Sequence, residues 1–251
     1  IDVLVIVSGA DNTPITVLNE NNFLPVLDGF PLEPTSFAGI TEDAPLSVAA
    51  TIDWSGSLDE FKPLITQSAE IFIDTLADTD TAAIYRFGAE IDANKQEFVV
   101  ADATGKDLLK DALYLDFAGQ LNPTDIWSAA DYASTQTAKQ TNPNRAVILL
   151  SDGNNNAVGG SSLQNLIDDA IAEDISVFTL GFGDIVSAPL EELAQETGGL
   201  YYEDPDAQAL NEIYQSIVAV LTNRYEFSIT LPQPDTESQL TIVVRDDQGN
   251  E

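Results

Sequence analysis

Cysteine and histidine are both absent from this chain of 251 residues. Their absence excludes thiolate nucleophiles, disulfide bonds, histidine-based catalytic triads and the usual zinc sites. The lack of cysteine does not place the protein in the cytosol, because secreted bacterial proteins often lack it as well. A metal site in this sequence therefore has to be built from oxygen-bearing side chains.

Basic residues are scarce. The chain has 9 lysines and arginines against 42 aspartates and glutamates, which gives a formal net charge of −33. A surface this negative repels nucleic acid and anionic membranes, so we expect neither as a partner. Two interpretations of the acidity stay open. The protein works in high salt, where screening suppresses self-repulsion, or it shares the ordinary acidity of many secreted bacterial proteins.

Long apolar runs are also missing, and none approaches the eighteen or so residues needed to span a bilayer. We therefore expect no membrane insertion. The sequence begins at Ile1 without a methionine and shows no signal peptide. We expect it to be a segment of a longer secreted or cell-surface protein, with targeting signals elsewhere. The 44% of hydrophobic residues is ordinary for a globular protein, and the length is sufficient for a sizeable core.

Residues 1–45 predict a β-rich N-terminal flank, because they have β-branched runs and turn residues but no helical periodicity. The prolines that follow the last of these runs predict an extended connector. The expected strands are 2–8, 15–18 and 22–27, and the connector contains Pro31, Pro34 and Pro45.

Residues 223–251 predict a second β-rich flank, because apolar residues alternate with polar ones over 225–231 and 240–244. These two runs indicate either a β-hairpin or two strands of a sandwich. Each flank alone is too short to bury a core, so we expect both to form one small β-sandwich into which the middle of the chain is inserted. The alternative is that they are fragments of two neighbouring modules.

Between the flanks, residues 46–222 alternate strands with helices, which is typical of a parallel α/β sheet. Runs that are apolar on both faces predict central strands. Apolar residues at three- and four-residue spacing predict the helices. The expected strands are 46–52, 82–87, 97–100, 145–151, 175–182 and 200–202, with helices between them and a last helix over 205–221.

Oxygen-bearing side chains follow two of these strands. Asp53, Ser55 and Ser57 come directly after the first strand and place three hard oxygens at alternate positions of one turn. Asp152 ends the apolar strand 145–151, and Thr124 lies between the two aspartates in sequence. In open α/β sheets, ligands bind beyond the carboxyl ends of the strands, where the strand order reverses. If the two strands are neighbours there, these side chains face one another.

The order Asp-x-Ser-x-Ser, then Thr, then an Asp closing a later strand, resembles the metal-ion-dependent adhesion site (MIDAS) of von Willebrand factor A (integrin I-like) domains. The resemblance covers roughly residues 46–222. It implies a doubly wound, mostly parallel six-stranded sheet flanked by helices, in which the two strands are neighbours. The family usually has glycines before the threonine, where this chain has Asn122-Pro123. That departure leaves the conformation of the loop open.

The resemblance also implies a ligand set for a divalent cation, Mg²⁺ first and Mn²⁺ or Ca²⁺ as alternatives. Hydroxyl oxygens come from Ser55, Ser57 and Thr124, and the carboxylates of Asp53 and Asp152 hold the ion directly or through water. So few charged ligands leave a coordination position open. In this family, an Asp or Glu carboxylate of a partner protein or peptide commonly fills it.

We therefore expect a cation-dependent adhesion module of a secreted or cell-surface bacterial protein, which binds its partner without turnover and is not an enzyme. One alternative is a subunit-docking domain of an intracellular ATPase or chelatase-type complex. Another is a metal-assisted hydrolase, although no pair of nucleophile and base is evident in the sequence.

Three further features lie near or outside this motif. Residues 154–156, three asparagines, indicate a polar loop at the rim of the site rather than ligands. Trp54 and Trp127 stand next to motif residues in the sequence, and ligand contact and plain packing both remain open for them. The run 246–250 favours a hairpin turn over a calcium site.

Overall fold

The computed structural model of the protein divides the chain into two compact units, a larger one of residues 44–217 and a smaller one of residues 1–43 with 218–251. Among the described residues, no helix has both the length and the apolar character required to cross a bilayer. The described residues are 2–5, 7, 15, 18–40, 44–205, 207–222, 225–231 and 240–245.

The larger unit is built on a six-stranded sheet in the order β10-β9-β8-β5-β6-β7, parallel except for the edge strand β7. The chain leaves β5 toward β6 on one side and later returns to β8 on the other side, so the strand order reverses between β5 and β8. This topology confirms the doubly wound, mostly parallel sheet that was predicted. The strands are β5 (Leu46–Asp53), β6 (Thr81–Phe87), β7 (Gln96–Val100), β8 (Asn144–Ser151), β9 (Ser176–Gly181) and β10 (Tyr201–Glu203).

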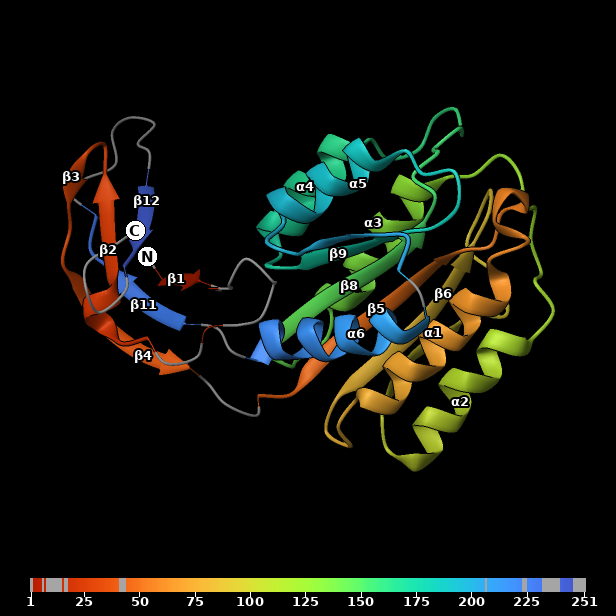
Figure 1. Cartoon of the computed structure of the whole chain (residues 1–251), viewed down its shortest axis with the longest axis horizontal. Helices are drawn as coiled ribbons and strands as arrows, with labels where there is room; N and C mark the ends of the chain where they lie inside the picture. Colours follow the sequence, from red (N-terminus) through yellow and green to blue (C-terminus); the bar gives the residue numbers. More distant parts are fainter. Residues whose placement is uncertain are drawn as a thin grey trace. The chain divides into compact units, whose positions relative to one another are not determined.

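Helices cover both faces of this sheet, α3, α4 and α5 on one face and α1, α2 and α6 on the other (Figure 1). Every residue of β5 is buried, as expected for a strand packed on both sides. The helix α5 ends just before Gly198, whose φ of +74° is the left-handed conformation that commonly stops a helix. The helices are α1 (Lys62–Thr75), α2 (Ala103–Tyr114), α3 (Ile126–Ala138), α4 (Leu163–Ala172), α5 (Ser187–Glu196) and α6 (Ala207–Thr222), the last belonging to this unit up to Ile217.

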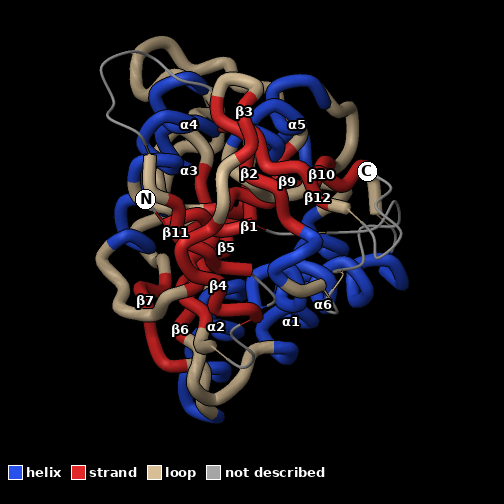
Figure 2. The backbone as a smooth tube through the Cα atoms, turned by 90° about the vertical axis from the view of Figure 1, so that its left-hand side faces the viewer, coloured by secondary structure: helices blue, strands red, loops and turns tan. Residues whose placement is uncertain are grey.

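The smaller unit contains two three-stranded antiparallel sheets, β1-β11-β4 and β12-β2-β3. Each sheet pairs strands that precede the larger unit with a strand that follows it (Figure 2). Apolar side chains of both sheets pack in one cluster around Phe23 and Tyr225, whose ring centroids are 4.9 Å apart. The strands are β1 (Asp2–Val5), β2 (Phe23–Leu27), β3 (Phe30–Pro31), β4 (Pro34–Ile40), β11 (Tyr225–Ile229) and β12 (Leu240–Val244).

The structure of the smaller unit contradicts the predicted connector and shows which of the two predicted arrangements of the last strands is present. The prediction of an extended connector is wrong for Pro34–Ile40, which forms β4. Pro34 is tolerated because it is the first residue of a strand at the edge of its sheet. β11 and β12 lie in different sheets, so they are not a hairpin. Most of the predicted strand 15–18, and the whole run 246–250, fall outside the described residues.

Candidate metal centre

Asp53 is the last residue of β5 and is completely buried. Its Oδ1 accepts a hydrogen bond of 2.9 Å from the backbone N–H of Ser55. Its Oδ2 accepts one of 2.7 Å from the hydroxyl of Ser151, the last residue of β8. Because β5 and β8 are parallel neighbours, their carboxyl ends lie at the same rim of the sheet. The neighbouring strand thus fixes the orientation of the Asp53 carboxylate.

A chain of hydroxyl groups connects this rim to the end of β8. The hydroxyl oxygens of Ser55 and Ser57 are 3.1 Å apart, and the Ser57 hydroxyl donates to Asp152 Oδ2 over 2.7 Å. The turn that carries both serines is tied down at its start, because the N–H of Trp54 donates to the carbonyl of Phe87. The structure therefore brings Ser55, Ser57 and Asp152 together beside Asp53. Ser55 is buried, whereas Ser57 is exposed.

Asp152 is 4% exposed and is also held in one orientation. Its Oδ1 accepts a 2.9 Å hydrogen bond from the N–H of Asn154, and its backbone carbonyl accepts one of 2.7 Å from the N–H of Val186. Gly153 has φ of +77°, and a Cβ there would lie 2.3 Å from the carbonyl oxygen of Val186. The turn after Asp152 therefore requires glycine for both its conformation and its space.

Thr124 is buried and immediately precedes Asp125, the N-cap residue of α3. Its N–H donates to the side-chain oxygen of Asn156 over 2.8 Å, and its carbonyl accepts from the N–H groups of Asn156 and Ala157, each at 3.1 Å. The peptide bond between Asn122 and Pro123 is cis. Thr124 is thus joined to the other predicted ligands through the loop that follows Asp152.

The sequence predicted no role for Ser151 and indicated only a polar rim for the three asparagines. Ser151 is the one polar residue near the end of an otherwise apolar run, and that position beside Asp152 is the signal that was available. Asn155 accepts a 2.7 Å hydrogen bond from the N–H of Ile126 at the start of α3, so Asn155 and Asn156 join two loops. Trp127 packs in the core of the larger unit.

The electrostatics of the site are set by two carboxyl groups, those of Asp53 and Asp152. Burial raises the pKa of the Asp53 carboxyl, hydrogen bonds from Ser55 and Ser151 oppose this rise, and the nearby charge of Asp152 adds to it. None of the ion pairs among the described residues involves Asp53 or Asp152. Among all the described residues, no three or more His, Cys, Asp or Glu side chains form a cluster that could hold a metal.

These residues fit a hard divalent cation. Two carboxylates and the hydroxyls around them provide only oxygen donors, which suit Mg²⁺, Mn²⁺ or Ca²⁺. A bound cation would also neutralise the charge of the buried Asp53 carboxylate, for which the described residues supply hydrogen bonds but no ion pair.

The family model described as the von Willebrand factor type A domain matches residues 48–216. The chain belongs to this family. Its VWA domain therefore comes from a family whose members commonly mediate metal-dependent protein binding. The match covers the six-stranded sheet from its first strand to α6.

Curated relatives match this chain at moderate identity. The inter-alpha-trypsin inhibitor heavy chain H4 of Homo sapiens is 31% identical over 197 residues, which are 73% of this chain. The chain spans 21% of the length of that relative.

Solved structures show the same fold at low identity. A von Willebrand factor type A protein from Catenulispora acidiphila superposes with a TM-score of 0.59 and 14% identity, covering 99% of this chain and 70% of the other. Proximal thread matrix protein 1 from the mussel byssus, in a structure with a zinc-occupied MIDAS motif, has a TM-score of 0.60 and 17% identity, covering 83% of this chain and 50% of the other.

Proposed function

We propose that this VWA domain binds a divalent cation at the rim between β5 and β8. The observation that carries the proposal is the Asp53 carboxylate, which is fully buried, has a raised pKa, and takes part in no ion pair among the described residues. Burying an unpaired charge is costly unless a counter-ion compensates it. The proposed ligands are Asp53, Ser55, Ser57, Thr124 and Asp152.

The cation takes part in binding and, in this proposal, in no turnover. A doubly charged ion held by two carboxylates and neutral hydroxyls keeps a strong attraction for a further anionic oxygen. Ser57, the exposed member of the set, marks the side from which a partner approaches. The partner in this proposal is a protein or peptide that offers an Asp or Glu carboxylate. Mg²⁺ is the proposed ion, with Mn²⁺ and Ca²⁺ as alternatives.

The proposal extends to the setting of the domain. We place it in a secreted or cell-surface protein, where it acts in adhesion. Support comes from the acidic, cysteine-free composition and from the likeness to a protein of the mussel byssus. In this organisation, residues 46–222 bind the cation and the partner, while residues 1–45 and 223–251 form a separate small β domain.

Titration calorimetry of Asp152→Ala tests the cation site. We expect the parent protein to bind Mg²⁺ or Mn²⁺ with one saturable transition, and the variant to show none. The substitution removes one of only two carboxylates in the ligand set, which is expected to weaken binding by roughly 100-fold or more.

Asp59→Ala is the matched control, because Asp59 lies close to the motif in sequence and its exposed carboxylate forms an ion pair with Lys62. This variant is expected to titrate like the parent. Equal heats for Asp152→Ala and the parent would refute the site, provided that circular dichroism shows both proteins folded.

A further inference from the structure

A groove beside the metal centre is not used by the function proposed above. It lies in the larger unit, between α1 and the segment that follows α2, and has a volume of about 600 Å³ that is largely open to solvent. Pockets of roughly 300–1,000 Å³ are typical of ligand sites. Trp54 lines the groove and stands between Asp53 and Ser55 in the chain, so the groove borders the turn that carries two of the proposed ligands.

The outer wall of the groove carries large apolar side chains that are open to solvent. Tyr114 is 66% exposed and Leu115 is 49% exposed, and Phe117 continues the same wall. Large apolar side chains gathered at one exposed place mark surfaces that other molecules cover. Aromatic residues in particular are enriched at the centres of protein interfaces.

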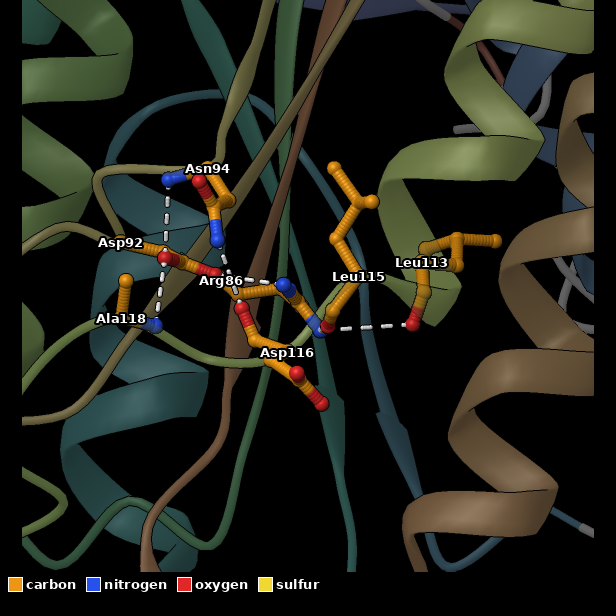
Figure 3. A network of polar contacts seen from close by, with 7 residues as sticks. All are labelled: Arg86, Asp92, Asn94, Leu113, Leu115, Asp116 and Ala118. Atoms are coloured by element: carbon orange, nitrogen blue, oxygen red, sulfur yellow. Dashed lines mark hydrogen bonds and ion pairs between the residues drawn. The ribbon is translucent and has the colours of Figure 1, made fainter.

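The backbone of this wall is held by a buried ion pair. Arg86, 1% exposed, lies 2.5 Å from Asp92, which is completely buried (Figure 3). Arg86 also donates to the carbonyls of Leu113 and Leu115, at 3.3 and 2.8 Å. Asp92 in turn accepts from the N–H of Ala118 over 3.0 Å. The wall is therefore fixed before any partner arrives, while its side chains remain exposed, which lowers the entropic cost of binding.

The two cationic side chains that line the groove, Lys62 and Arg86, already have acidic partners. Lys62 pairs with Asp59 at 2.5 Å, and its ammonium lies 5.3 Å from the centre of the Trp54 ring. The Arg86 guanidinium, paired with Asp92, lies 5.0 Å from the same ring. The Tyr114 hydroxyl donates to a Glu70 oxygen over 2.8 Å. Neutralised cations leave little attraction for a second carboxylate, whereas the aromatic and aliphatic surface is left uncovered.

We propose that this groove receives a large apolar side chain, best an aromatic one, from the same partner segment whose carboxylate binds the cation. The proposal rests on the proposed function, because the cation anchors the segment. An extended segment advances roughly 3.3–3.6 Å per residue, so a side chain two positions from the acidic residue is placed about 7 Å along the chain. Recognition would then require an acidic and an aromatic residue close together in the partner.

Three blocked tripeptides serve as probes for the test, in the presence of saturating Mg²⁺. The probes are acetyl-Glu-Gly-Phe-amide, acetyl-Glu-Gly-Gly-amide and acetyl-Gln-Gly-Phe-amide. Binding is followed by calorimetry or by the fluorescence of Trp54 in a Trp127→Phe background, which leaves one tryptophan in the chain. We expect the Glu-Phe probe to bind roughly tenfold more tightly than the Glu-Gly probe, which corresponds to about 1.4 kcal/mol. The Gln probe is expected to bind weakly.

Leu115→Ser tests whether the groove causes this preference. It removes an exposed side chain of the wall but keeps the backbone carbonyl that binds Arg86. Leu108→Ser is the matched control, because Leu108 is an exposed leucine of α2 outside the groove. We expect the tenfold preference to be lost in Leu115→Ser and kept in Leu108→Ser, with Mg²⁺ affinity unchanged in both.

The outcomes separate this inference from the proposed function. If both Glu probes bind equally and only with Mg²⁺, the groove has no role while the cation function stands. If Leu115→Ser keeps the tenfold preference for the Glu-Phe probe, the groove does not cause that preference and the groove proposal is wrong. If Mg²⁺ binds but neither Glu probe does, the carboxylate function fails and the groove proposal fails with it.

Discussion

At the scale of single residues, the candidate site depends on residues that position the proposed metal ligands through hydrogen bonds but do not bind the cation themselves. Ser151 fixes one oxygen of Asp53, and Asn156 fixes the backbone on both sides of Thr124. Groups of this kind around a metal commonly affect affinity about as strongly as some ligands do, by roughly 10–100-fold. Their effect arises because an ion site loses affinity when its oxygens are free to move apart.

Asn156→Ala is therefore expected to weaken Mg²⁺ or Mn²⁺ binding by roughly tenfold without abolishing it. The substitution removes the oxygen that accepts from the N–H of Thr124 over 2.8 Å, so the Thr124 loop is no longer joined to the loop after Asp152 by this side chain. Calorimetric titration of each purified variant measures the change.

Asn154→Ala provides the comparison within the same run of asparagines. Asn154 contributes its backbone N–H to Asp152, and alanine retains that group. We expect its dissociation constant to match that of the parent. Identical affinities for Asn154→Ala and Asn156→Ala would show that the side chain of Asn156 does not position Thr124.

At the scale of elements, the site follows from where two strands end and from how the loops beyond them are fixed. The reversal of strand order between β5 and β8 puts Asp53 and Asp152 at one rim. The loop between α2 and α3 is bound at several points to the segment after β6. One link is Asn94, which donates to the carbonyl of Asp116, and another is Ala89, which donates to the carbonyl of Gln120.

Asp92→Ala is expected to destabilise the protein by about 3–5 kcal/mol, because it leaves the Arg86 guanidinium buried without its counter-ion. It also removes the acceptor for the N–H groups of Asn94 and Ala118. Urea unfolding measures the loss. Asp107→Ala, which removes an exposed aspartate of α2, is expected to change stability by no more than about 0.5 kcal/mol. Comparable losses in the two variants would contradict the role of the pair.

The elements of the larger unit were predictable because their patterns are local. A strand such as β8 contains an unbroken apolar run from Ala146 to Leu150, and that pattern alone indicates a central parallel strand. β4 was not predictable in the same way, because Pro34 and Gly39 weaken the strand pattern and its pairing with β11 joins residues nearly two hundred positions apart.

The residues that position the proposed ligands were also hard to predict, because their contacts join distant parts of the sequence. Asp53, Ser55 and Ser57 lie within five consecutive residues, so the motif is visible in the sequence. Asn156, in contrast, is 32 positions from Thr124, to which it is hydrogen-bonded. Nothing in a run of three asparagines indicates which of them faces another loop. The buried pair of Arg86 and Asp92 was equally hidden, because an arginine within a strand is usually expected to face solvent.

At the scale of the whole molecule, the charge of −33 and the proposed cation site respond to different ions. Self-repulsion among many surface carboxylates weakens with any salt, since the Debye length falls from about 10 Å at 0.1 M to about 3 Å at 1 M. A specific site responds only to ions that it binds. Both effects stabilise the folded protein, so they are separable only when ionic strength is held constant.

Mg²⁺ at fixed ionic strength is therefore expected to raise the melting temperature of the parent protein and not that of Asp152→Ala. Mass action stabilises a folded state by about 2.7 kcal/mol when the free ion reaches 100 times its dissociation constant. For a protein of this length, each kcal/mol corresponds to roughly 2–4 °C. Sodium chloride raised tenfold is expected to stabilise both proteins by similar amounts, because screening does not depend on the site. A parent and a variant that gain equally from Mg²⁺ would mean that the ion acts only on the acidic surface, and the buried charge of Asp53 would then be left without its proposed counter-ion.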